Sequence, residues 1–133
     1  MCLVAGVIPK IMVQRITGGT RPVKAAYDEL EFYNKESIIN IILNNNHNKS
    51  LRKDYLYVLG LLNSELINWF YAKRFTNFSK LTVNLSKEYL SQIPVKIISI
   101  EIQLVFSMLV DYILIANKVL LRNLWVDFSM RRT

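Results

Sequence analysis

The sequence predicts an α+β fold, with a small, mainly antiparallel or mixed β-sheet, packed helices and a long C-terminal helix. Short runs rich in β-branched residues fill positions 10–43 and are separated by glycine, proline and asparagine. From about Arg52, apolar residues recur at three- and four-residue spacing, which is typical of a helix. An almost continuous apolar stretch follows Ser99 and is long enough for many helical turns.

The N-terminal part is expected to form the sheet. Pro9 and the Gly18-Gly19 pair bound its first β-branched run, and the glycines indicate a turn. Isoleucines dominate its last run. The expected strands are Lys10–Thr17, Val23–Asp28, Glu31–Tyr33 and Ser37–Leu43, and a polar loop is expected at 44–50.

A helix pair is expected next. Asn63 and Ser64 interrupt the helical stripe, and Ser64 is a suitable N-cap for a second helix. After this pair we expect three short elements: a strand at Leu81–Leu85, a helical turn at Ser86–Ser91 and a strand at Ile93–Ile97 entered through Pro94.

The last helix is expected from Ile100 to Trp125, with Ser99 as its cap. Its polar residues follow one narrow line, whereas a surface helix usually has a wider polar face. The helix is therefore either covered on several sides or paired with another copy. A transmembrane helix is the competing interpretation, but Asp111 lies in the middle of the run, so no membrane is expected.

Length and charge restrict the class of protein. The 133 residues suit one domain, with the sheet and helix pair at 9–97 and the long helix at 99–125. Seventeen basic and ten acidic side chains give a net charge of +7. This balance favours a polyanionic partner, nucleic acid first and an anionic membrane second.

The sequence lacks the residues of common catalytic and metal sites. The single cysteine, Cys2, excludes an internal disulfide and suits the reducing cytoplasm. With His47 as the only histidine, no zinc site of usual composition can form. Asp28, Glu29 and Glu31 indicate a turn rather than a catalytic or metal site. No enzyme activity and no cofactor are therefore expected for this chain alone.

The segment from Leu59 to Val95 is the main candidate for nucleic-acid binding. No acidic residue lies between Glu65 and Glu88, and cations there alternate with uncharged hydrogen-bonding side chains. Cations neutralise phosphates, while amides and hydroxyls can contact base edges. The candidates here are Lys73, Arg74, Asn77, Ser79, Lys80, Thr82, Asn84 and Lys87. Lys73 and Arg74 have a structural alternative, because cations at the C-terminus of a helix also complement its dipole.

Further candidates lie nearer the N-terminus. Gln14 suits adenine and Arg15 suits guanine if they point into a groove, and otherwise they form a solvated edge strand. Arg21 follows the glycine turn and could approach a phosphate, or belong to an ordinary hairpin. Asn34 and Lys35 form a polar insert that is either a DNA-facing loop or a simple turn. Among the aromatic residues, only Phe75 and Phe78 are left open for base stacking.

Several segments resemble the C-terminal specificity domain of TaqI-like adenine DNA methyltransferases, which include fused type IIG restriction–modification enzymes. The similar segments are PKIMVQRITGGTRPVKAAYD at 9–28, FYNKESIINIIL at 32–43 and YLYVLGLLNSELINWFYAKRFTNFSKLTVNLSKEYLSQIPV at 55–95. The LLNSELINWFY and LSQIPV combination is the most specific part. The last helix departs from the resemblance because it is more apolar than is usual in the family.

The resemblance implies a target recognition domain that docks on double-stranded DNA and selects a short sequence. A separate methyltransferase catalytic domain or subunit, using S-adenosylmethionine, would then methylate an adenine. This sequence has neither a G-x-G-x-x-G motif nor an Asn-Pro dipeptide, so the recognition module is expected without its catalytic domain. The alternative is a non-catalytic remnant that forms a homodimer through the C-terminal helix and acts as a protein-interaction module.

Overall fold

The computed structural model describes residues 8–30, 33–43, 52–76 and 81–130, with side chains described up to position 123. The fold is α+β, as predicted. The elements in chain order are β1 (Lys10–Gln14), β2 (Ile16–Thr17), β3 (Ala25–Asp28), β4 (Ile38–Ile41), α1 (Arg52–Leu62), α2 (Glu65–Tyr71), a π-helical turn (Ala72–Thr76), β5 (Val83–Asn84), α3 (Lys87–Ser91) and α4 (Ile100–Met130).

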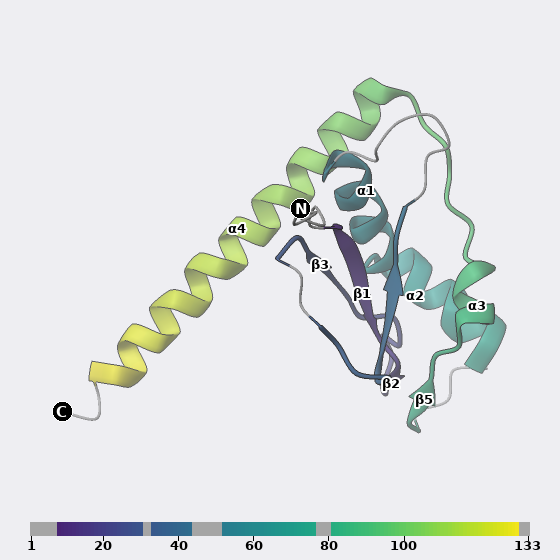
Figure 1. Ribbon diagram of the computed structural model, residues 1–133, viewed down its shortest axis with the longest axis horizontal. Coiled ribbons are helices and arrows are strands. Elements are labelled where there is room, and N and C mark those ends of the chain that lie inside the picture. The colour runs from purple at the N-terminus through teal and green to yellow at the C-terminus, as the bar shows by residue number, and fades with distance from the viewer. Residues whose placement is uncertain (1–7, 31–32, 44–51, 77–80, 131–133) are drawn as a thin grey trace, which may run out of the picture.

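A three-stranded antiparallel sheet in the order β3-β1-β4 forms one layer, and α1 and α2 pack on one face of it (Figure 1). Ile11 and Val13 of β1 are fully buried against the helices. Met12 and Gln14 alternate with them and point to the other face, because successive side chains of a strand alternate. The core therefore lies between the sheet and the helix pair.

The predicted strand Lys10–Thr17 is interrupted at Arg15, where the chain changes partners. The Arg15 N–H donates to the Ser37 carbonyl at 2.9 Å, whereas the Arg15 carbonyl accepts from the Leu85 N–H at 2.7 Å. Beyond this residue, β2 pairs with β5 in a separate two-stranded sheet. The sequence could not show this break, because both partners of Arg15 are distant in the chain.

Two asparagines of the helix pair hold the turn that leads into β3. The side chain of Asn63 donates to the Ala25 carbonyl at 2.9 Å and accepts from the Ala25 N–H at 3.0 Å. Asn68 is buried and accepts from the Val23 N–H at 2.9 Å. The strand expected from Val23 therefore begins at Ala25. In the same turn Gly19 has a φ of 82°, which favours glycine.

The predicted start of α2 is confirmed. The Ser64 hydroxyl accepts from the Ile67 N–H at 3.2 Å, which is an N-cap hydrogen bond. The expected strand at Ile93–Ile97 is wrong, because residues 93–99 form no regular element. Pro94 lacks an N–H, and only Ile93 of this segment is buried. The prediction at Glu31–Tyr33 lies mostly outside the described residues, as does the loop at 44–50.

The long helix α4 ends at Met130, beyond the expected Trp125, and only its first half packs on α1 (Figure 1). The first part of its polar line, from Gln103 to Asp111, faces α1, whereas Lys118 and Arg122 are exposed. Gln103 donates to the Asp54 carboxylate at 2.6 Å, and the Ser107 hydroxyl donates to the Lys53 carbonyl at 2.7 Å. Arg52 pairs with Asp111 at 2.8 Å, and this bond lowers the pKa of the Asp111 carboxyl.

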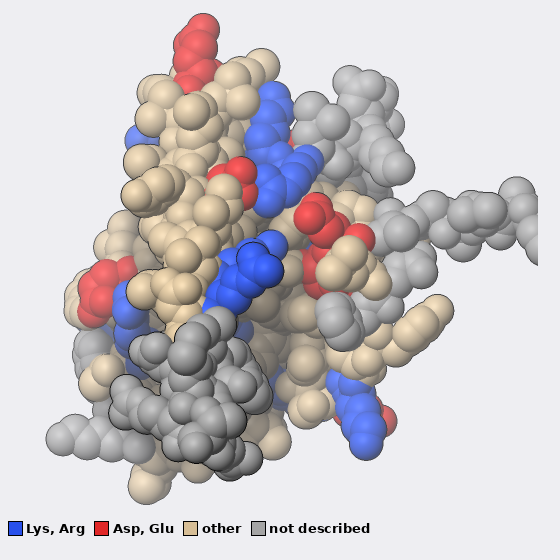
Figure 2. Space-filling model, turned by 90° about the vertical axis from the view of Figure 1, so that its left-hand side faces the viewer, with Lys and Arg blue, Asp and Glu red and all other residues tan. Residues whose placement is uncertain are grey.

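The apolar side of α4 is left at the surface. The helix from Ile100 to Asn123 contains an 18-residue window with a mean hydropathy of 1.9, and by length and composition it could cross a membrane. Only 6% of its most apolar window is buried. Figure 2 shows this side of the molecule, where uncharged residues cover most of the described surface of the helix.

Candidate nucleic-acid interface

β2 and β5 form a short antiparallel ribbon, which we call the β2–β5 ribbon. In its register Ile16 lies opposite Asn84 and Thr17 opposite Val83. Thr17 and Val83 are buried, whereas Ile16 and Asn84 are exposed on the other face. The ribbon lies at the lower end of the molecule in Figure 1. A two-stranded ribbon is one of the elements that the major groove of DNA can admit.

The ribbon brings together predicted residues that are about seventy positions apart. Arg15 is exposed where β1 passes into β2, and its carbonyl accepts from Leu85 next to β5. Thr82 and Asn84 are both exposed, while Val83 between them is buried, so the expected alternation is present. A cation and two hydrogen-bonding side chains therefore border the same two strands.

Other predicted cations surround this region. Lys35 is exposed in the loop before β4. The same loop contacts Arg15, whose N–H donates to the Ser37 carbonyl. Lys87 is exposed at the start of α3, directly after β5, although Glu88 is exposed beside it. Lys87 therefore follows the ribbon closely in the chain, and Lys35 lies close in the chain to the residue that contacts Arg15.

Two predicted residues instead make contacts within the domain. Arg21 forms an ion pair with Glu65 at 3.1 Å and donates to the Asn63 carbonyl at 3.5 Å. The amide of Asn34 exchanges hydrogen bonds with that of Asn40, at 2.9 and 3.3 Å. Arg21 is exposed and Asn34 is half-buried, and a role of either residue in DNA binding stays a prediction.

Lys73 and Arg74 are exposed on the π-helical turn after α2. The Lys73 ammonium lies 4.8 Å from the centre of the Trp69 ring, which is a cation–π contact. Phe75, one of the aromatic residues left open for base stacking, instead stacks on Tyr89 with ring centres 4.6 Å apart. The other residues predicted in this loop, Asn77, Phe78, Ser79 and Lys80, lie outside the described residues.

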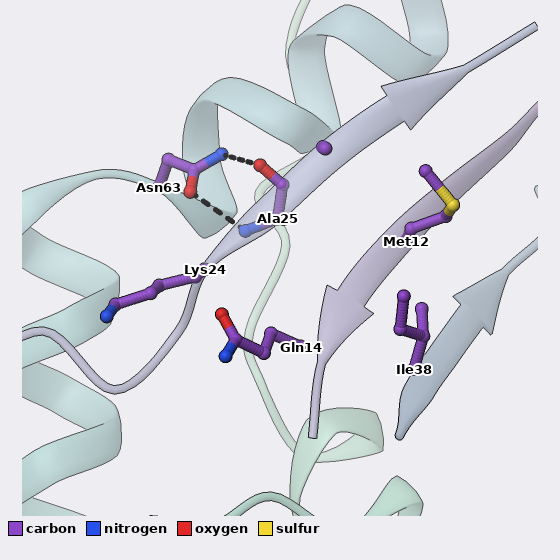
Figure 3. Close-up of a pocket in the computed structure, with 7 residues that line it drawn as sticks. Met12, Gln14, Lys24, Ala25, Ile38 and Asn63 are labelled. Carbon is purple, nitrogen blue, oxygen red and sulfur yellow. Dashed lines mark hydrogen bonds between the residues drawn. The ribbon is translucent and has the colours of Figure 1, made fainter. Parts of the chain in front are cut away.

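A hollow of about 320 Å³ lies on the outer face of the sheet, at the end nearest the ribbon. The exposed Gln14 lies at its rim, and Met12 and Ile38 supply an apolar lining (Figure 3). Gln14 also donates to the Ile16 carbonyl at 2.9 Å, which connects it to β2. An amide beside apolar groups is the combination that can contact adenine and the thymine methyl group.

Most residues that line this hollow were not predicted as site residues from the sequence. Lys24 is exposed and lines it together with Ala25 and Ala26, yet only Gln14 was singled out. The strand alternation that pairs Met12 with Gln14 could have identified the face. Within the described residues, no group of three metal-binding side chains lies together.

The fold and the β2–β5 ribbon define a class, a small α+β recognition domain with cations around one exposed ribbon. The chain belongs to the TaqI-like C-terminal specificity domain family, whose model matches residues 5–95. It is thus a DNA-recognition domain of the restriction–modification type, and a specificity domain is itself non-catalytic. Searches of curated proteins and of solved structures gave no significant match.

Proposed function

We propose that this chain reads the target sequence for an adenine-specific DNA methyltransferase, or for a type II restriction–modification enzyme that contains one. The catalytic domain or subunit, with its S-adenosylmethionine, would be supplied separately, and the complex would work in the cytoplasm on double-stranded DNA. The observation that carries the proposal is the β2–β5 ribbon, which exposes Asn84 and begins directly after the exposed Arg15.

In the proposed binding mode, the ribbon enters the major groove and the surrounding cations contact phosphates. Arg15, Lys35 and Lys87 supply the sequence-independent attraction, which releases counterions and therefore weakens as salt rises. Asn84 and Gln14 carry the amides that can contact base edges. Lys80, outside the described residues, remains a predicted phosphate contact of the same group.

The test is a fluorescence-anisotropy titration of labelled duplex DNA over a salt series. Arg15→Ala should weaken all duplexes alike and lower the salt slope by about one unit, because one phosphate contact is lost. Arg21→Ala is the matched control, since it removes the same charge from a residue already held by Glu65. The control should keep the slope of the unmodified chain.

The outcomes separate two parts of the proposal. Binding that is equal at low and high salt, or no binding at all, would contradict DNA recognition by this chain. Equal losses for Arg15→Ala and Arg21→Ala would show that only net charge matters, and would remove the ribbon from the interface.

A second candidate function is a protein-interaction module that no longer engages DNA. The exposed apolar surface of α4 favours it, because such a surface usually marks a contact site. The same DNA titration distinguishes the two candidates, since an interaction module would show no salt-dependent binding.

A further inference from the structure

The side of α4 opposite to α1 carries a regular apolar stripe. Residues at alternating three- and four-residue spacing form it, which is the a and d pattern of a coiled coil. The stripe consists of Ile102, Val105, Leu109, Tyr112, Ala116 and Val119. Met108 and Ile115 flank it on one side, and apart from the half-buried Ala116 these residues are 52–72% exposed.

The contacts with α1 use the opposite side of the same helix. Phe106 and Val110 both lie against Gly60 of α1, and Leu114 packs against the core. In the heptad that places the stripe at a and d, Val110 and Leu114 occupy the outward positions b and f, and Phe106 occupies position e beside the stripe. The stripe is therefore available for a partner without disturbing the contact with α1.

The stripe is larger than the apolar patch of an ordinary monomer and approaches the area of a stable interface. Its large apolar side chains and the two flanking ones expose roughly 700 Å², at roughly 100 Å² each on the area scale of apolar burial. A single apolar patch on a monomer is typically 300–600 Å², and a stable interface buries about 800 Å² per partner. The C-terminal half of the helix also projects from the body (Figure 1), and an unpacked helix of that length is marginal in water.

The contacts of α4 with α1 argue against a membrane as the cover. Gln103, Ser107 and Asp111 lie along the apolar stretch and bind the first turn of α1. Burying α4 in a bilayer would carry Arg52 and Asp54 of that turn into the hydrocarbon, where charged groups are strongly disfavoured.

We propose that the stripe binds the same stripe of a second copy of this chain, with the two helices antiparallel. Such a pairing sets Ile102 opposite Val119 and Leu109 opposite Tyr112, so apolar layers continue along the whole stripe. It also brings Glu101 of one copy beside Arg122 of the other, at the two g positions that pair in antiparallel coils. The two bodies then lie on opposite sides of the helix pair.

The first test is the mass of the full chain by light scattering at micromolar concentration. The expected mass is about 31 kDa, twice the 15.5 kDa of one chain. Leu109→Glu should yield the single-chain mass, because it places a charge inside the stripe. The matched control is Leu121→Glu, since Leu121 is equally exposed, at 59% against 60%, but lies outside the stripe.

Each result decides the proposal. A monomeric unmodified chain, or a dimer that Leu109→Glu leaves intact, would overturn it, as would dissociation by Leu121→Glu. A monomer that sediments with neutral phospholipid vesicles would assign the stripe to a membrane instead.

Orientation is tested by oxidation in a Cys2→Ser background. A mixture of Ile102→Cys and Val119→Cys chains should form the mixed disulfide, because a disulfide requires Cβ atoms about 3.5–4.5 Å apart. Cross-linking of Ile102→Cys with itself would show parallel helices and overturn the antiparallel arrangement.

Discussion

Gly60 allows α4 to approach α1 closely, and its replacement by alanine tests that contact. A Cβ at this position would lie 2.6 Å from Phe106 Cε1 and 2.6 Å from Val110 Cγ2. Carbon atoms normally approach to about 3.5–4.0 Å, so the helices or the two side chains would have to move. Overpacking of this kind costs about 1–3 kcal/mol.

The helix propensity of alanine opposes this cost. Alanine stabilises a helix interior by about 0.8–1.0 kcal/mol relative to glycine. The net loss for Gly60→Ala is therefore about 1 kcal/mol, which for a domain of this size lowers Tm by about 3–5 °C. Thermal unfolding followed by circular dichroism measures it.

Two variants make the prediction specific. Gly18→Ala is the control, because the nearest atom to its Cβ would be the Leu81 carbonyl oxygen at 4.0 Å, so Tm should not fall. In a Val110→Ala background Gly60→Ala should cost less, since one of the two close contacts is gone. A Gly60→Ala variant as stable as the unmodified chain would refute the close packing of α1 and α4.

Three further predictions concern the core, the α4 contact and the reading of bases. Asn68→Ala should destabilise the chain by about 1–3 kcal/mol in urea unfolding, because the buried Val23 N–H loses its acceptor; no change would remove this role. The pKa of Asp111 is lowered by Arg52, so the pair stabilises the folded state above pH 4 and this stability is lost as pH falls below about 4. Asp111→Asn should flatten that acid dependence, and identical pH profiles would contradict it. Gln14→Ala should relax selection at one base pair by about 1–3 kcal/mol in enrichment from a random duplex pool, whereas an unchanged consensus would exclude Gln14 as a base contact.

The sequence was most informative where local interactions decide the structure. The helix break at Asn63-Ser64 was predictable because a serine hydroxyl caps an N–H only three residues away. The alternation of exposed Thr82 and Asn84 with buried Val83 was also predictable. Successive side chains of a strand point to opposite faces, whichever strand it pairs with. Neither inference needed knowledge of distant residues.

The sequence was less informative where a residue's partner lies far along the chain. Arg15 ends one strand and starts another because Ser37 and Leu85 bind its two backbone groups. The ion pair between Arg21 and Glu65 joins residues 44 positions apart, so only the fold could reveal it. For Ile93–Ile97, β-branched composition predicted a strand, yet no neighbouring strand pairs with the segment.

By itself, the sequence determined the α+β class, the helix pair and the long apolar helix, because hydrophobic periodicity and caps act within a few residues. The tertiary structure alone decided which face of α4 turns inward. The polar line of Gln103, Ser107 and Asp111 faces α1, because Arg52, Lys53 and Asp54 offer it partners there. The same arrangement leaves the apolar stripe on the outer side of α4. The sequence could not reveal this, because these hydrogen bonds join residues 49 to 59 positions apart and form only when the chain has folded.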